Sequence, residues 1–109
     1  MDLQILRVPE NVDPRIGVQV LSEIADLLHK SKPHVALDLT RTKSFDGQGW
    51  LDSVDYWADR LKLYGGELVA FGGSPHVEHR FRLHSKTGGI RFFPDEDATA
   101  GYFAQKSNS

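Results

Sequence analysis

The sequence predicts an α/β protein: one domain with a mixed, largely parallel sheet of about four to five strands and four helices. Three observations predict this class. Apolar runs of strand type alternate with stretches of helical period along the chain. Residues that favour helix starts precede the helical stretches. The length of 109 residues suits a single domain over 1–109, with parallel neighbours joined by right-handed crossovers.

Composition excludes several classes of function. The formal charge is −2, from 13 basic and 15 acidic residues, which argues against a general nucleic-acid binder. The chain has no cysteine, so disulfides, thiol catalysis and zinc–thiolate sites are excluded. No apolar run approaches the length of about 18–20 residues that spans a membrane. The N-terminus lacks the charge order of a signal peptide, so we expect a cytoplasmic protein without direct membrane insertion.

The first predicted elements are a strand and a helix. Residues 3–8 form the strand, which Pro9 ends. Asp13 and Pro14 are a typical cap and first helical residue. Pro33 then stops the helix. The strand places Leu3 and Ile5 on one face, with Arg7 as a candidate third member. The helix has one apolar stripe, formed by Gly17, Val20, Leu21, Ile24, Leu27 and Leu28.

The central elements follow. Residues 34–40 are apolar enough for a strand buried on both faces. A helix begins after Gly49 and ends at Gly65–Gly66, and residues 67–71 form the next buried strand. The buried stripe of that helix is Trp50, Leu51, Val54, Trp57, Ala58 and Leu61.

The last part of the chain repeats the pattern. Ser74–Pro75 caps a third helix, residues 90–93 form a last strand, and Asp95 caps a terminal helix that runs through Phe103. One shared core is expected to bury Val35, Leu37, Leu39, Trp57, Leu61, Val69 and Phe71.

The corner between the central strand and the second helix is the leading candidate site. Asp46 can accept hydrogen bonds from the first free N–H groups of the helix, and Gly47 and Gly49 leave the helix start bare. Such a corner suits an anion or the acidic group of a partner. The plain alternative is that Asp46 only caps the helix.

The same stretch resembles a STAS domain, the module of bacterial anti-sigma factor antagonists and sulfate transporters. The resemblance rests on Leu37-Asp-Leu-Thr40, Phe45-Asp-Gly-Gln-Gly-Trp50, the run from Gly65 to Pro75, and Phe92-Phe-Pro-Asp95 with Ala98. It covers most of the chain from about Val18. STAS domains usually begin with a longer hairpin, so the first family strand is expected to be shortened or missing.

The resemblance implies a non-enzymatic regulatory domain in bacterial signalling that binds a protein and has no cofactor. The implied partner is an anti-sigma factor kinase, so that binding frees a sigma factor and regulates transcription. One alternative is the STAS-type small subunit of a lipid-transport ABC system. Another is a domain that senses a small ligand or nucleotide at the helix start. A homodimer remains open.

The resemblance places partner binding at the corner and on the adjoining helix, where acidic residues and an exposed tyrosine also suit an interface. The residues are Asp46, Gly47, Gln48, Gly49, Asp52, Ser53 and Tyr56. The family's switch serine is replaced by Gln48, which has no hydroxyl and cannot carry a phosphate. Ser44 and Ser53 lie nearby and are candidate modification sites, although neither aligns with the switch.

The other motifs in the sequence give weaker indications of a functional site than the corner does. His76 and His79 are one helical turn apart, but no third ligand is evident, so we predict no metal site. The glycine pairs match no phosphate-loop pattern, and no nucleophile motif is present. At least one of Trp50 and Trp57 is expected to pack the second helix against the sheet.

Overall fold

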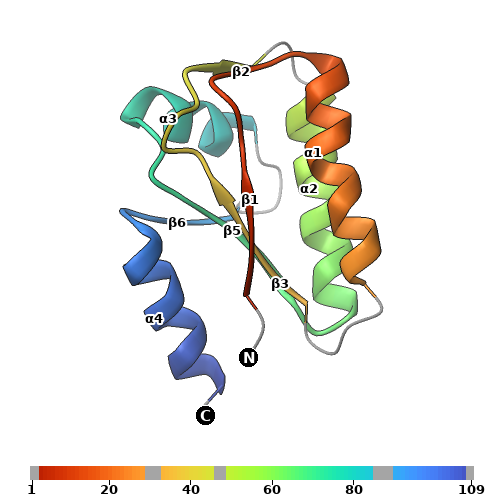
Figure 1. Ribbon diagram of the computed structural model, residues 1–109, viewed down its shortest axis with the longest axis vertical. Helices are drawn as coiled ribbons and strands as arrows, with labels where there is room; N and C mark the ends of the chain where they lie inside the picture. The colour runs from red at the N-terminus through yellow and green to blue at the C-terminus, as the bar shows by residue number, and fades with distance from the viewer. Residues whose placement is uncertain (1–2, 29–32, 46–48, 85–89, 108–109) are drawn as a thin grey trace.

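The computed structural model describes residues 3–28, 33–45, 49–84 and 90–107, and its centre is a parallel sheet (Figure 1). Four strands pair in parallel in the order β1 (Leu3–Arg7), β3 (His34–Asp38), β5 (Glu67–Phe71) and β6 (Arg91–Phe93). A second, small sheet pairs β2 (Asn11–Val12) with β4 (Ser44–Phe45). The predicted α/β fold class is confirmed.

Helices cover both faces of the four-stranded sheet. Two of them, α1 (Pro14–Leu27) and α2 (Gly49–Leu63), lie side by side on one face, and α4 (Glu96–Ser107) lies on the other (Figure 1). The shorter α3 (Pro75–His84) packs beside α2. The order and type of the helices are as predicted.

Three of the four predicted helix caps are confirmed. The Asp13 carboxylate accepts from the Ile16 amide at 2.8 Å, and the Asp95 carboxylate accepts from the Ala98 amide at 2.8 Å. The Ser74 hydroxyl accepts from the Val77 amide at 3.3 Å. These side chains satisfy amides that would otherwise have no partner at each helix start. The fourth cap, Asp46, lies outside the described residues.

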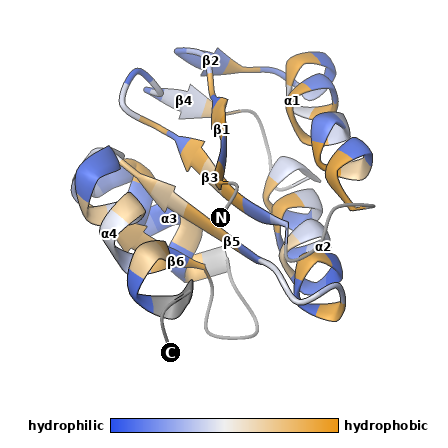
Figure 2. Cartoon of the chain, turned by 60° about the horizontal axis from the view of Figure 1, so that its bottom comes forward, coloured by the Kyte–Doolittle hydropathy of each residue, from blue (hydrophilic) through white to orange (hydrophobic). Residues whose placement is uncertain are grey.

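The core is divided in two, which corrects the prediction of one shared core. The larger cluster lies between the sheet and α1, α2 and α3, and it contains Val35, Leu37, Leu39 and Leu61, with Trp57 only partly buried at its margin. The smaller cluster, under α4, consists of Ala36, Val69, Phe71 and Phe103. Side chains alternate between the two faces of a strand, so Val69 and Phe71 point away from Leu68 and Ala70. Both clusters include apolar residues of β3 and β5, and Figure 2 shows the hydrophobic colouring of these two strands.

Glycine permits the close approach of α1 and α2. Gly17 is buried in α1, and a Cβ atom at this position would overlap with the ring of Trp50 in α2. Trp50 itself is buried in the larger cluster, as expected for at least one of the two tryptophans. Gly17 therefore fixes how closely the two helices pack.

The element boundaries differ from the prediction in several places. Both β1 and β3 stop earlier than predicted, at Arg7 and Asp38, and α1 ends at Leu27. The short strands β2 and β4 were not predicted, because two residues are too few to show a period. Within the described residues, β1 is the edge strand of the sheet, so the long hairpin with which STAS domains usually begin is not present there.

No helix in the described part of the chain has both the length and the apolar character needed to cross a membrane.

Candidate functional site

Only part of the predicted corner can be placed. Asp46, Gly47 and Gln48 lie outside the described residues, so the roles given to them stay predictions. Gly49 begins α2 and is exposed, and a Cβ atom there would meet no other atom within 4 Å. Packing among the described residues therefore does not explain the glycine at this position.

The other predicted contact residues share α2. Asp52 and Tyr56 are exposed and Ser53 is partly exposed, and the residues at 49, 52, 53 and 56 follow helical spacing. The Ser53 hydroxyl donates to the Gly49 carbonyl at 3.1 Å. These residues continue the helix surface that begins at Gly49.

Tyr56 is the most prominent side chain on this surface. It is 54% exposed, although its ring contacts Trp57 edge-on at a centroid distance of 5.2 Å. The Arg60 guanidinium lies 5.8 Å from the centre of the same ring. A large ring held by neighbours but open to solvent is suited to protein contacts.

The opposite side of α2 fixes the helix in place. Trp50, Leu51, Val54, Ala58 and Leu61 are buried, which confirms all of the predicted stripe except Trp57, which is partly buried. Because this side packs on the sheet and on α1, the exposed side is presented in a fixed orientation. We call the exposed residues Gly49, Asp52 and Tyr56, together with the partly exposed Ser53, the α2 surface.

The two candidate modification sites are accessible to different extents. Ser44 in β4 is exposed, and its hydroxyl donates to the Asn11 side-chain oxygen at 2.8 Å. Ser53 is partly exposed in the first turns of α2, where a phosphate would lie near the positive end of the helix dipole. Modification of either serine stays a prediction.

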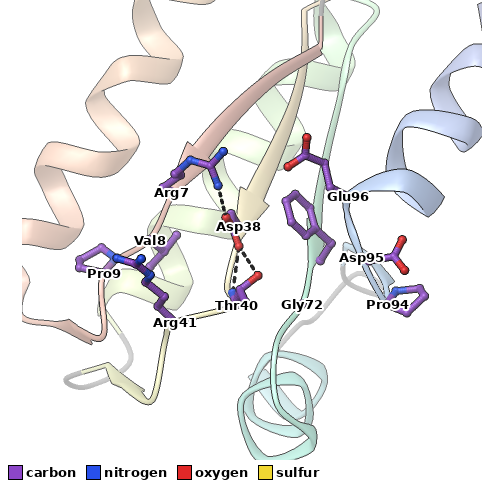
Figure 3. A pocket seen from close by; sticks show the side chains of 11 residues that line it. Arg7, Val8, Pro9, Asp38, Thr40, Arg41, Gly72, Pro94, Asp95 and Glu96 are labelled. Carbon is purple, nitrogen blue, oxygen red and sulfur yellow. Dashed lines mark hydrogen bonds and ion pairs between the residues drawn. The ribbon is translucent and has the colours of Figure 1, made fainter.

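A second region, which the sequence did not indicate, lies at the carboxyl end of the sheet (Figure 3). It is a pocket of about 700 Å³, which we call the strand-end pocket. In open α/β sheets, ligands commonly bind outside the carboxyl ends of the strands. The lining residues are Arg7, Val8, Pro9, Asp38, Thr40, Arg41, Phe71, Gly72, Pro94, Asp95 and Glu96.

Asp38 is the centre of a polar network in this pocket. Its Oδ2 accepts from Arg7 Nη1 at 2.6 Å, and its Oδ1 accepts from the Thr40 amide at 2.9 Å and from the Thr40 hydroxyl at 2.5 Å. Figure 3 shows these three bonds converging on one carboxylate. The Asp38 side chain is only 11% exposed, whereas that of Arg7 is 72% exposed.

The network keeps Asp38 ionised. Burial alone would raise the pKa of Asp38, but the hydrogen bonds from the Thr40 side chain and amide and from Arg7, with the charge of Arg7, lower the pKa below its usual value. At neutral pH the ionised carboxylate therefore links the Arg7 guanidinium at the end of β1 to Thr40 at the start of the loop after β3.

One feature of the sequence, Asp38, could have indicated this pocket but was not used to predict it. Asp38 is a charged residue that directly follows the apolar residues 35–37 of β3, and such a residue needs a partner when it is buried. That partner, Arg7, lies 31 residues away, and the two meet because β1 and β3 pair with Arg7 opposite Asp38.

His76 and His79 are both exposed on α3. The described residues contain no group of three or more histidine, aspartate or glutamate side chains placed to hold a metal ion.

The fold is that of a STAS domain, as solved structures show. The anti-sigma factor antagonist SpoIIAA in its unphosphorylated form is similar with a TM-score of 0.71 and 14% identity, over 93% of this chain and 87% of that chain. SpoIIAA of Bacillus in its phosphorylated form has a TM-score of 0.67 and 15% identity, over 90% and 88%. The STAS domain of a SulP transporter from Vibrio cholerae has a TM-score of 0.67 and 10% identity, over 98% and 85%.

No family model matches the sequence, and no curated protein matches it. The likeness is therefore one of fold, carried by the arrangement of strands and helices and not by sequence identity.

Proposed function

We propose that this chain is a non-enzymatic regulatory domain of the STAS type that binds a protein partner through the α2 surface and the corner at Asp46, Gly47 and Gln48. The observation that carries the proposal is Tyr56, a large aromatic side chain that is 54% exposed on a helix whose other side is fixed in the core. Interfaces draw most of their binding energy from a few such anchors.

The fold neighbours support this proposal. One is an anti-sigma factor antagonist, and it has been solved in unphosphorylated and phosphorylated forms. By analogy, the partner of this chain is an anti-sigma factor kinase in the bacterial cytoplasm, and binding would release a sigma factor. Fold analogy is an association and not a mechanism, so the α2 surface is where the proposal must be tested.

A second candidate partner is a transporter subunit, because another neighbour is the STAS domain of a SulP transporter. The α2 surface serves both candidates, since each requires contact with a protein. Copurification followed by mass spectrometry separates them by naming the partner.

The proposed domain differs from a phosphorylated antagonist in its control. By the resemblance, Gln48 takes the position of the family's switch serine, and a glutamine provides no hydroxyl for a phosphate. A phosphate would add about −1.5 to −2 charge at neutral pH. Gln48 matches the uncharged state, so we propose that this chain binds its partner without a phosphate switch at position 48.

Two exposed tyrosines, one in the middle of α2 and one just after its end, provide a matched test. Tyr56 lies on the α2 surface, and Tyr64, which is 48% exposed, follows the last residue of the helix. With the copurified partner in titration calorimetry, we expect Tyr56→Ala to weaken binding about 30-fold or more, the loss typical of an interface anchor. Tyr64→Ala should change the affinity by less than about 2-fold. Equal losses in both variants, with both folded, would place the interface elsewhere.

A second variant tests the corner. Gln48→Glu introduces one negative charge near a helix start, where a carboxylate is tolerated or mildly favourable for folding. Partner binding should nevertheless weaken, because the charge imitates part of the phosphorylated state of the family. Unchanged affinity in Gln48→Glu would refute the role of the corner and leave the test of Tyr56 unaffected.

A further inference from the structure

The strand-end pocket has two walls of opposite charge. Figure 3 shows Arg7 and Arg41 on one side of the Asp38–Thr40 pair, and Asp95 and Glu96 on the other. The first wall comes from the end of β1 and the loop after β3. The second comes from the start of α4.

The basic wall, formed by Arg7 and Arg41, has hydrogen-bond donors that no described residue uses. Arg7 is held in place by one bond, from Nη1 to Asp38, while a guanidinium has five N–H donors. Its side chain is 72% exposed, so the remaining donors are open to a ligand. Arg41 is exposed and has no hydrogen-bond or ion-pair partner among the described residues. Two guanidinium groups at one pocket suit a carboxylate or phosphate.

The acidic wall is also available. Glu96 is exposed in the first turn of α4, and its carboxylate has no partner within the described ranges. One oxygen of Asp95 is occupied by the Ala98 amide. Asp38 is less available to a cation than these two residues, because it already accepts one bond from Arg7 and two from Thr40.

Charge balance selects the class of ligand. A simple anion would meet three carboxylates, Asp38, Asp95 and Glu96, and a simple cation would meet two guanidinium groups. A molecule with one charge of each sign can satisfy both walls. Apolar side chains, those of Val8, Pro9, Phe71 and Pro94, also line the pocket and suit a short carbon chain. The volume of about 700 Å³ falls in the range of small-molecule sites, about 300–1,000 Å³.

We propose that the strand-end pocket binds a small zwitterion of the amino-acid class, with its carboxylate at Arg7 and Arg41 and its ammonium group at Glu96. Asp38 and Thr40 are positioning residues, because Asp38 holds Arg7 and Thr40 holds Asp38. None of the residues that line the site belongs to α2, so the site is distinct from the α2 surface of the proposed partner contact.

The test uses amino acids in which the distance between the ammonium group and the carboxylate increases. The full chain, labelled with ¹⁵N, is titrated with glycine, β-alanine, 4-aminobutyrate and 6-aminohexanoate, and with propionate and propylamine as the two half-molecules. NMR follows the amides of Thr40, Gly72 and Glu96. We expect at least one zwitterion to bind at least 10-fold more tightly than either half-molecule.

Variants then assign the two ends. Arg41→Gln and Glu96→Gln should each weaken the best zwitterion at least 10-fold, since each removes one charge from an exposed side chain without disturbing the core. Lys43→Gln is the matched control, because Lys43 is an exposed cation two residues away that pairs with Glu10 and does not line the pocket. Half-molecules that bind as well as every zwitterion, or equal losses in all three variants, would overturn the proposal. So would the absence of any shift in the three amides.

Discussion

Replacing Asp38 by asparagine removes the buried charge that organises the strand-end pocket. The asparagine oxygen can still accept from the Thr40 amide and hydroxyl, but its amide group would face Arg7 Nη1, where two donors now meet at the place of a 2.6 Å ion pair. A hydrogen bond to a charged group contributes about 1.5–3 kcal/mol. Water can solvate Arg7, which is 72% exposed, so part of this loss is recovered. We expect Asp38→Asn to lower the free energy of unfolding at pH 7 by about 1–3 kcal/mol.

The effect should depend on pH in a known direction. The pKa of Asp38 is lowered in the folded protein, so the carboxylate contributes stability above its unfolded value of 3.8 and loses that contribution as the pH falls through the lower folded pKa. The difference between wild type and Asp38→Asn should therefore be constant from pH 7 to about pH 5 and shrink below pH 3.8.

Urea unfolding measures both quantities, from the midpoint and slope at each pH. Asp59→Asn is the control, because Asp59 is an exposed aspartate in α2 for which the same chemical change should alter stability by less than about 0.5 kcal/mol. Equal effects of the two substitutions at pH 7 would refute the argument. A difference that grows as the pH falls would refute the assigned direction of the pKa shift.

Three further predictions concern the core, the helix contact and the switch. Leu37 is fully buried, so Leu37→Ala should cost about 2–5 kcal/mol in urea unfolding, and a loss below about 0.5 kcal/mol would contradict its place in the core. Gly17→Ala should destabilise the protein by about 1–2 kcal/mol, because the new Cβ overlaps with Trp50. Gly101→Ala, which has open space around it in α4, should stabilise the protein by about 0.5–1 kcal/mol. Thermal melts that rank the two variants in the reverse order would contradict this packing. If the proposed partner is an anti-sigma factor kinase, incubation with that kinase and ATP should leave the chain without phosphate near Gln48. Stoichiometric phosphate on Ser44 or Ser53, mapped by mass spectrometry, would show that the switch has moved.

Much of the fold could be predicted because its signals are local. Asp13, Ser74 and Asp95 mark helix starts by their own side chains, and the stripe along α2 is visible in its spacing. The two-residue strands β2 and β4 have no such local signal, since their pairing depends on how the loops around them fold.

The division of the core and the strand-end pocket required tertiary information. Val69 and Phe71 are apolar in sequence, but only the presence of α4 on one face shows which cluster they enter. Asp38 and Arg7 carry opposite charges, but their sequence separation hides the pairing until β1 is placed beside β3 in the observed register. The resemblance to STAS domains predicted the fold, and it did not point to this pocket.

The helices on the two faces of the sheet differ in how easily they can detach from it by local unfolding. One face is covered by α1 and α2 together with α3, and the other by α4, which contacts β3, β5 and β6. The α4 helix is attached by Phe103 and by a bond from the Tyr102 hydroxyl to Glu67 at 2.8 Å. Amide exchange should therefore be faster in α4 than in β3 and β5, because a local opening of this helix costs less than global unfolding. Each opening would carry Glu96 away from Arg41 while α2 stays in place, so occupancy of the pocket and order in α4 should rise and fall together.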